Sequence, residues 1–501
     1  MRRCNTPEFC FLMRLFKGLN IQLDYNAMHA SKSDVSARSL AERLRLAGRR
    51  PVFLPPLRGA GEFAGCAAIY AVGQCCNLLF QLLLLRHFGA EGYGRIGLSH
   101  LVFLLVTFVG DLGYGTLFLR ERPGSTNWER QWRLALGHRL MVTVALFAVT
   151  LAGWSVLYGR SGEGFDYLAA TVPAGLIGLA SLASVLLAEG RRIPSLIVQQ
   201  MPWPAALLAW WAVDGADGSA ARAGLIVSAG FLVQPVVALC LGGRARLLLP
   251  AFGAGSAMFA AALRLSLMGV TGALHDRLTP FLVARLAPDF LPAMLLLGHA
   301  INGASGVLLQ VNRLLLPHVG TREGLAWSCR LLALISIGVA VAFQLLWLAM
   351  MARADGGVAF HPSLLMPSLM AGCISFVGSV LATELIGRHL ERQLTSIILT
   401  GIAVSSALQL LAAIQSSADG VLWARVIGVA GIAAACFRSC GIMPEASGWA
   451  LCGSLLFAAL GVMNQLAWLG STLLLVGVVI AMACDRPLLR RRSAIVAEPS
   501  S

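Results

Sequence analysis

The stretch that organises the chain is residues 86–121, RHFGAEGYGRIGLSHLVFLLVTFVGDLGYGTLFLRE. A glycine-rich turn, FGAEGYG, joins the end of one apolar run to the whole of the next. Asp111 lies inside that second run, framed by Gly110, Gly113 and Gly115. A carboxylate at membrane depth is costly, and such groups usually face a bundle interior or a water-filled cavity. Asp111 is therefore a candidate substrate-binding or coupling residue, with a hydrogen bond in helix packing as the alternative.

Apolar runs like this one recur along nearly the whole chain of 501 residues. The sequence is 57% hydrophobic and 13% charged, whereas about a quarter of the residues of a soluble protein are charged. Runs of about 20 apolar residues are typical of transmembrane helices. They are continuous rather than alternating, which favours helices over a barrel. The sequence therefore predicts an all-α polytopic membrane protein.

The runs predict about fourteen transmembrane helices, and a count of about twelve stays open. The expected spans are residues 63–85, 96–119, 140–158, 167–187, 194–213, 223–241, 257–274, 291–310, 327–350, 364–386, 395–414, 421–437, 446–462 and 468–484. Pro202 and Pro204 should kink or break the fifth span. The loops are short, so soluble chemistry has no extramembrane domain to host it.

The net charge of +15 does not indicate a nucleic-acid partner. The basic residues lie between spans and at the two ends, as the positive-inside rule expects. With the N-terminus in the cytoplasm, most arginines fall in inner loops, among them Arg130, Arg133 and Arg139. The charge distribution therefore predicts an even number of spans with both termini cytoplasmic.

Signatures of catalysis are missing from the sequence. It contains no phosphate-cradling GxxxxGK[ST], no HExxH and no CxxC pair. Its 12 cysteines show no ligand spacing. We therefore expect a transporter rather than an enzyme, with no catalytic residue, no metal site, no disulfide framework and no cofactor.

Four further charged residues join Asp111 as candidates. Arg264 lies within span seven, where an arginine needs an anion, a cavity or the interface. Asp276 and Arg277 follow that span; being adjacent, they cannot face each other on one helix, so each is expected to pair across helices. Asp276 and Arg277 have two possible interpretations: part of an external gate, or part of a solvated cluster at the membrane interface. Glu384, near the end of span ten, is either an intramembrane carboxylate or an interfacial one.

Uncharged polar residues also occur inside the spans. Gln74, Asn77 and Gln81 share one face of span one by their three- and four-residue spacing. His299 in span eight can titrate near neutrality, although a lone histidine in a span is more often part of hydrogen-bonded packing.

The opening stretch resembles the start of the Wzx-like polysaccharide flippases, a branch of the multidrug/oligosaccharidyl-lipid/polysaccharide (MOP) exporter superfamily. Those proteins open with a span, a G-x-x-x-Y/F-G turn, and a second span ending in a D-x-G…R-like pattern. Here the turn runs from Gly89 to Gly94, and the ending is Asp111, Gly113 and Arg120. LHDRLTPFLVARLAPDFLPAMLLL and NRLLLPHVG resemble the family's segments after span seven and at the end of span eight.

The resemblance implies a MATE-like architecture around a central cavity. Two pseudo-symmetric six-helix bundles would cover residues 61–245 and 246–440, and two extra helices residues 441–485, between basic cytoplasmic tails at 1–60 and 486–501. One departure is Asp289-Phe290-Leu291-Pro292, where the family commonly has an aromatic residue with alanine. This departure bears on substrate and gate residues more than on the fold.

The resemblance also implies a function. A Wzx-like flippase moves undecaprenyl-diphosphate-linked oligosaccharide repeat units from the cytoplasmic to the periplasmic leaflet of the bacterial inner membrane. It serves O-antigen, capsule or exopolysaccharide biosynthesis, beside a polymerase and a chain-length regulator, by alternating access coupled to H+ or Na+. Two alternatives stay open: a multidrug or small-molecule antiporter of related fold, and a non-transporting membrane subunit of a glycan-assembly complex.

Overall fold

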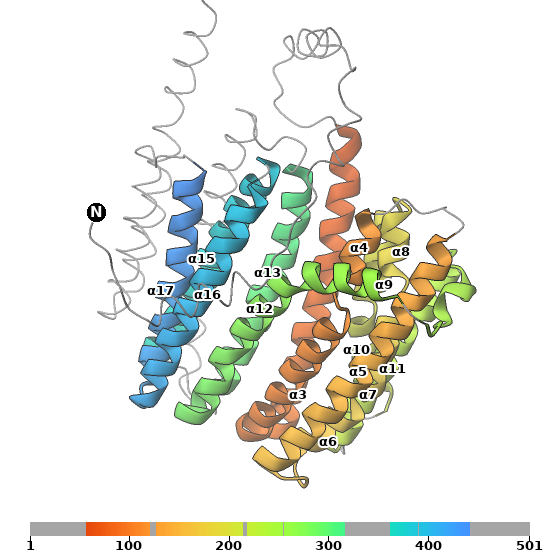
Figure 1. The fold of residues 1–501 in the computed structure, drawn as a ribbon. Coiled ribbons are helices and arrows are strands. Elements are labelled where there is room, and N and C mark those ends of the chain that lie inside the picture. Colours follow the sequence, from red (N-terminus) through yellow and green to blue (C-terminus); the bar gives the residue numbers. More distant parts are fainter. Residues whose placement is uncertain are drawn as a thin grey trace, which may run out of the picture. The chain divides into compact units, whose positions relative to one another are not determined.

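The computed structural model describes residues 57–120, 127–213, 218–253, 255–315, 361–388 and 390–440. In these ranges the regular structure is helical and contains no strand (Figure 1). Eight candidate spans there are long and apolar enough to cross a membrane. The chain is therefore an all-α multi-pass membrane protein, as predicted. The expected spans at 327–350, 446–462 and 468–484 lie outside the described residues, as do both expected tails apart from residues 57–60.

The first two expected spans share one long element, α3 (Leu57–Gly110), which bends at Gly89. Gly89 has φ 69° and ψ −178°, a conformation that glycine adopts without steric cost. The hydroxyl of Tyr93 donates to Oε1 of Gln81 across 3.4 Å. Twelve residues of straight helix would separate them by about 18 Å, so the chain turns back at Gly89.

Shorter helices follow in the first half of the chain. They are α4 (Tyr114–Arg120), α5 (Trp128–Tyr158), α6 (Glu163–Ala170), α7 (Val172–Leu179), α8 (Ala183–Ala188), α9 (Arg192–Gln200), α10 (Pro202–Ala212) and α11 (Ala220–Cys240). The break expected at the prolines of the fifth span is confirmed, because α9 ends at Gln200 and α10 begins at Pro202. Ser219 caps α11 by accepting from the backbone N–H of Arg222, which fixes where that helix begins.

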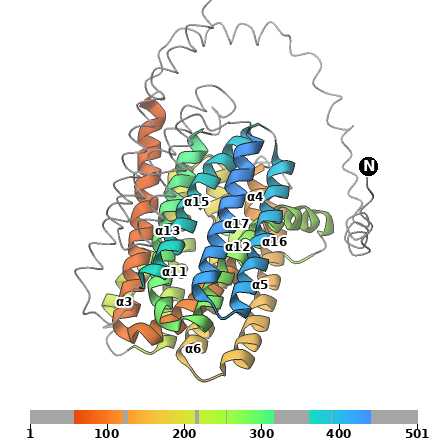
Figure 2. The same cartoon turned by 90° about the vertical axis from the view of Figure 1, so that its left-hand side faces the viewer.

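The second half of the chain is built from longer helices. After the 3₁₀ turn η4 (Ala245–Leu248) come α12 (Ser256–Leu286), the turn η5 (Pro288–Phe290), α13 (Leu291–Leu315), α15 (Pro362–Gly387), α16 (Glu391–Ile414) and α17 (Ala418–Ser439). Helices α15, α16 and α17 lie side by side in both views (Figure 1 and Figure 2). The first part of α12 runs across the other helices in Figure 1.

Three of the differences between the helix boundaries and the expected spans matter for the site. Span two is not continuous, because α3 ends at Gly110 and α4 begins only at Tyr114. Helix α5 begins at Trp128, so Arg130, Arg133 and Arg139 lie in a helix and not in a loop. Helix α12 continues through residues 275–277 to Leu286, so that triplet is helical rather than a loop beyond the span.

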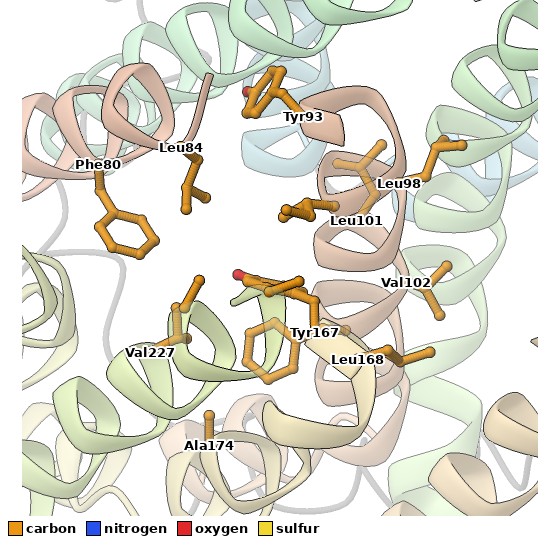
Figure 3. Packing of buried hydrophobic residues seen from close by; sticks show 14 of the residues in the cluster. Phe80, Leu84, Tyr93, Leu98, Leu101, Val102, Tyr167, Leu168, Ala174 and Val227 are labelled. Atoms are coloured by element: carbon orange, nitrogen blue, oxygen red, sulfur yellow. The ribbon is translucent and has the colours of Figure 1, made fainter. Parts of the chain in front are cut away.

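Apolar packing positions these elements. The largest cluster joins α3 with α6, α7, α10 and α11, and Figure 3 shows Phe80, Tyr93, Tyr167 and Val227 among its members. Leu291 and Leu295 of α13 belong to the same cluster. A side chain at Gly97 would collide with Leu295, so α3 and α13 are in close contact there.

Candidate functional site

The first polar site is the turn at residues 111–113 between α3 and α4, here named the Asp111 junction. Leu112 and Gly113 both adopt left-handed backbone angles, with φ 52° and 73°. Such a residue commonly ends a helix, and Leu112 does so against its steric preference. A Cβ at Gly113 would lie 2.9 Å from the carbonyl oxygen of Ala262 and 3.0 Å from the amide nitrogen of Ser266. The junction therefore sits directly against the backbone of α12.

Asp111 is held by a buried arginine. Its Oδ1 lies 2.5 Å from Nη2 of Arg139 on α5, and the two side chains are 31% and 7% exposed. Its Oδ2 accepts from the amide of Gly115 across 3.3 Å, at the positive end of α4. The guanidinium of Arg139 also lies 5.8 Å from the ring centroid of Trp132, within cation–π range. Through its contacts with Arg139 and Gly115, Asp111 therefore connects the turn between α3 and α4 to α5.

Helix α5 also holds the connector between α11 and α12. Trp132 donates its indole N–H to the carbonyl of Leu247 across 3.1 Å, and Arg133 donates Nε–H to the carbonyl of Leu249 across 3.0 Å. His138 lies 2.8 Å from the hydroxyl of Tyr114 and 3.2 Å from the carbonyl oxygen of Gly253. One face of α5 thus joins the Asp111 junction to the chain that leads into α12.

The second site is a pair of buried histidines, His100 on α3 and His299 on α13, named the histidine pair. They are 0% and 6% exposed, and their ring centroids lie 5.7 Å apart. Nδ1 of His100 lies 2.8 Å from the hydroxyl of Tyr167. When that hydroxyl donates, Nε2 of His100 carries the proton and is a donor. The Nε2 atom of His100 and the Nε2 atom of His299 both lack a hydrogen-bond partner.

Arg277 of α12 completes this second site. Its positive charge acts on both rings of the histidine pair, and its Nε is buried without a hydrogen-bond partner. Within the part of the chain that the structure describes, Arg277 forms no ion pair. Buried donors are normally satisfied, and leaving one unpaired is costly. Arg277, His100 and His299, named the donor cluster, therefore combine one positive charge with three unpartnered buried nitrogens, an arrangement suited to an anion.

Amide side chains lie along the first part of α3. Gln81 accepts from Tyr93, while its own Nε2 and the Oδ1 of Asn77 are buried without partners. Gln74 donates to Oε1 of Gln200 across 2.9 Å, and a Cβ at Gly303 of α13 would lie 3.3 Å from Cβ of Gln74. Of the three residues expected to share a polar face, Gln74 thus contacts α13 at Gly303 and α9 through Gln200.

The third site joins α12 to α16 and α17. Asp276 pairs with Arg425 of α17 across 3.2 Å, while the neighbouring His275 contacts Ser405 and Gln409 of α16 at 2.9 and 3.2 Å. Thr279 donates to Oε1 of Gln409 across 2.7 Å. Asp276 and Arg277, adjacent in sequence, thus take part in different sites.

Glu384 belongs to a separate contact at the end of α15. It is 1% exposed, and its Oε1 lies 2.8 Å from both Nε and Nη2 of Arg388 one turn later. Arg388 also donates to the carbonyl of Cys440, so the pair ties the end of α15 to the end of α17. The structure thus gives Glu384 a helix-tying contact and does not bring it together with Asp111, Asp276 or Arg277. The side chain of Arg264 lies outside the described residues.

Replacing Glu384 by glutamine should lower stability, because it removes the negative charge of a buried ion pair with Arg388 while keeping one acceptor oxygen. Hydrogen bonds to charged groups contribute about 1.5–3 kcal/mol. Because the amide oxygen still accepts, we expect the free energy of unfolding to fall by about 1 kcal/mol, measured as a lower thermal unfolding midpoint of the purified protein. Glu391→Gln, at an exposed position of α16, is the matched control. Unchanged unfolding together with lost transport would instead make Glu384 a functional carboxylate.

Two residues that matter in these sites are not found by reasoning from the sequence. The charge distribution places Arg139 in an inner loop, although Trp128, Trp132, Ala135 and Leu136 set a helical period that reaches it. His100 is inconspicuous inside the apolar run LSHLVFLL. The one sequence feature that could have pointed to His100 is its polar ring in the middle of an apolar run.

The structure is that of a multi-pass helical membrane protein, and its fold is similar to the folds of a solved lipid flippase and of solved MATE transporters. The fold is similar to that of the lipid II flippase MurJ in an inward closed conformation, with a TM-score of 0.61, 10% identity, and coverage of 85% of this chain and 99% of that one. It is also similar to a proline-to-alanine mutant of a MATE transporter (TM-score 0.52, 13% identity, 76% and 95% covered).

A third similar structure is the eukaryotic MATE transporter AtDTX14, with a TM-score of 0.52, 12% identity, and coverage of 82% of this chain and 99% of that one. No protein-family model and no curated protein matches the sequence. Since the identities are this low, the three structures establish the fold and carry no assignment of substrate.

Proposed function

We propose that the protein is a flippase for undecaprenyl-diphosphate-linked oligosaccharide repeat units, acting in O-antigen, capsule or exopolysaccharide biosynthesis. The observation that carries this proposal is the donor cluster. Arg277, His100 and His299 come from three different helices and have buried nitrogens without partners. A diphosphate offers many acceptor oxygens and negative charge, which a guanidinium binds well.

The rest of the substrate fits the same reasoning. A lipid tail can stay in the bilayer while the charged head group enters the helix bundle, because only the head group needs polar partners. On α3, the unpartnered Oδ1 of Asn77 and Nε2 of Gln81 would offer hydrogen bonds to sugar hydroxyls. Flipping needs no covalent step: it requires two conformations that bind the head group differently from each side.

The fold is equally compatible with a small-molecule antiporter, since MATE transporters share it. An exporter of cationic drugs would be served by unpaired carboxylates. In the described ranges Asp111, Asp276 and Glu384 each have an arginine partner, whereas Arg277 has none. The distribution of unpaired charge therefore favours an anionic substrate.

We also propose that the flippase lies in the bacterial inner membrane. The arginine bias of the sequence predicts both termini in the cytoplasm, although Arg130, Arg133 and Arg139 lie in α5 and not in the loop assumed in that count. A polymerase and a chain-length regulator would act on its product. Asp111 and Arg264 remain candidate cavity or coupling residues in this proposal. Helix α12, which carries Arg264, packs against the Asp111 junction.

Deletion of the gene tests the proposal directly. Lipid-linked repeat units should accumulate on the inner leaflet, and surface glycan should disappear, because the polymerase is deprived of substrate. The measurement is surface-glycan staining together with enzymatic accessibility of the lipid-linked sugars in spheroplasts. Normal surface glycan combined with increased sensitivity to small toxic cations would favour the antiporter. Normal glycan with no transport phenotype would favour a non-transporting subunit.

A further inference from the structure

The polar network on the other side of α12 consists of His275, Asp276, Thr279, Ser405, Gln409 and Arg425. Residues two positions apart on a helix point about 200° apart, so His275 faces α16 while Arg277 faces the histidine pair. His275 and Gln409 are 6% and 0% exposed, and Ser405 is fully buried. This network therefore lies outside the donor cluster, although both are built on the same helix.

Hydrogen bonds fix the state of His275 in this conformation. Thr279 donates to Oε1 of Gln409, which directs the amide nitrogen of Gln409 toward Nε2 of His275 at 3.2 Å. An amide nitrogen only donates, so Nε2 accepts and the ring is neutral with its proton on Nδ1. A buried histidine held as an acceptor has to break this contact before it can bind a second proton.

The charges around His275 make such a change consequential. Nδ1 lies 4.0 Å from Oδ1 of Asp276, the same oxygen that lies 3.2 Å from Arg425 of α17. Arg425 and Asp276 are the charged groups that act on His275, and α16 contributes only the neutral Ser405 and Gln409. On α13, His299 lies against His100 instead. An imidazolium at His275 would therefore compete directly with Arg425 for Asp276.

We propose that His275 is a proton-binding site whose occupation loosens α12 from α16 and α17, and so couples a proton gradient to the conformational cycle. When His275 takes a proton from water, Nε2–H donates to the hydroxyl oxygen of Ser405, and the amide of Gln409 turns away. The imidazolium then attracts the carboxylate of Asp276, which is 63% exposed and so reaches the water that supplies the proton. The proposal rests on the protein being a transporter, but not on the identity of its substrate.

Hydrogen–deuterium exchange of the full-length protein in lipid nanodiscs tests this site without any substrate. Between pH 8 and pH 5.5, the range in which imidazoles titrate, wild-type amides of α16 and α17 should exchange faster after correction for intrinsic rates. We expect about a fivefold increase, the size produced by losing one weak ion pair. His275→Gln should abolish the increase, while the exposed His361→Gln should keep it.

Two further variants keep the test decisive if His275→Gln does not fold. Gln409→Glu places a carboxylate beside Nε2, stabilises the imidazolium, and should raise the midpoint of the exchange response by about one pH unit. Asp276→Asn removes the ionic tie and should give fast exchange at both pH values. Any one of three results would overturn the proposal. They are wild-type exchange that does not depend on pH, an exchange response that persists in His275→Gln, and a midpoint in Gln409→Glu equal to that of wild type. Because no substrate is present, failure here is distinct from failure of the flippase assignment.

Discussion

Asp111→Ala should destabilise the protein by about 3 kcal/mol, the lower end of the cost of breaking a buried ion pair. The reason is that Arg139, with only 7% of its side chain exposed, would keep a buried charge without its carboxylate. Its Nε already has no hydrogen-bond partner, so the loss of Asp111 leaves little compensation beyond the Trp132 ring. The measurement is the thermal unfolding midpoint of purified protein, together with the amount inserted in the membrane.

Further variants distinguish the contribution of the Asp111–Arg139 ion pair from that of the hydrogen bond between Asp111 and Gly115. Asp111→Asn keeps an oxygen for the amide of Gly115 and should lose less than Asp111→Ala. Arg139→Met leaves the carboxylate, which is 31% exposed and reaches solvent, and should also lose less. Combining Asp111→Asn with Arg139→Met should recover part of the loss, because residues in contact are non-additive.

An exposed ion pair supplies the control for the Asp111 junction. Arg95 and Glu91 are 59% and 82% exposed, so Arg95→Ala should change stability by no more than about 0.5 kcal/mol. If Asp111→Ala is as mild as Arg95→Ala and yet stops export, Asp111 acts in transport rather than in holding α3, α4 and α5 together.

The fold was largely predictable because membrane helices are specified by apolar length, a property that can be read directly along the chain. The bend at Gly89 and the break at Pro202 were also predictable, since glycine and proline impose local backbone geometry. The break at Asp111 was not, because it depends on Leu112 adopting a left-handed backbone against α12. Tertiary contact, rather than local preference, decides that turn.

The sequence indicated which charged residues belong to the sites, but it did not indicate which residues they pair with. Charged residues such as Asp111 and Asp276 are conspicuous beside apolar runs. Their partners, Arg139 and Arg425, lie 28 and 149 residues away along the chain and cannot be predicted from sequence spacing. The histidine pair was harder still. Its two rings lie in different halves of the chain, and each alone is indistinguishable from a packing residue.

On the proposed flippase function, Arg277→Ala should reduce export by about tenfold to hundredfold, because a hydrogen bond to a charged group contributes about 1.5–3 kcal/mol and 1.4 kcal/mol is a factor of ten. A lysine at this position would keep the charge without the planar fork, so Arg277→Lys should fall between Arg277→Ala and wild type. The measurements are surface glycan in the complemented deletion strain and binding of a polyisoprenyl diphosphate to the purified protein.

Arg285→Ala is the matched control for Arg277→Ala, because Arg285 lies on the same helix at an exposed position. It should leave export and diphosphate binding unchanged. His100→Phe and His299→Phe keep an aromatic ring while removing the unpartnered Nε2 atom of each histidine, so each should weaken diphosphate binding further in the Arg277→Lys background. Binding that is equal in wild type and Arg277→Ala would remove the donor cluster from substrate recognition. Since Arg277 has no ion-pair partner in the described ranges, its replacement should cost little stability, and a loss of export then reports on the substrate rather than on folding.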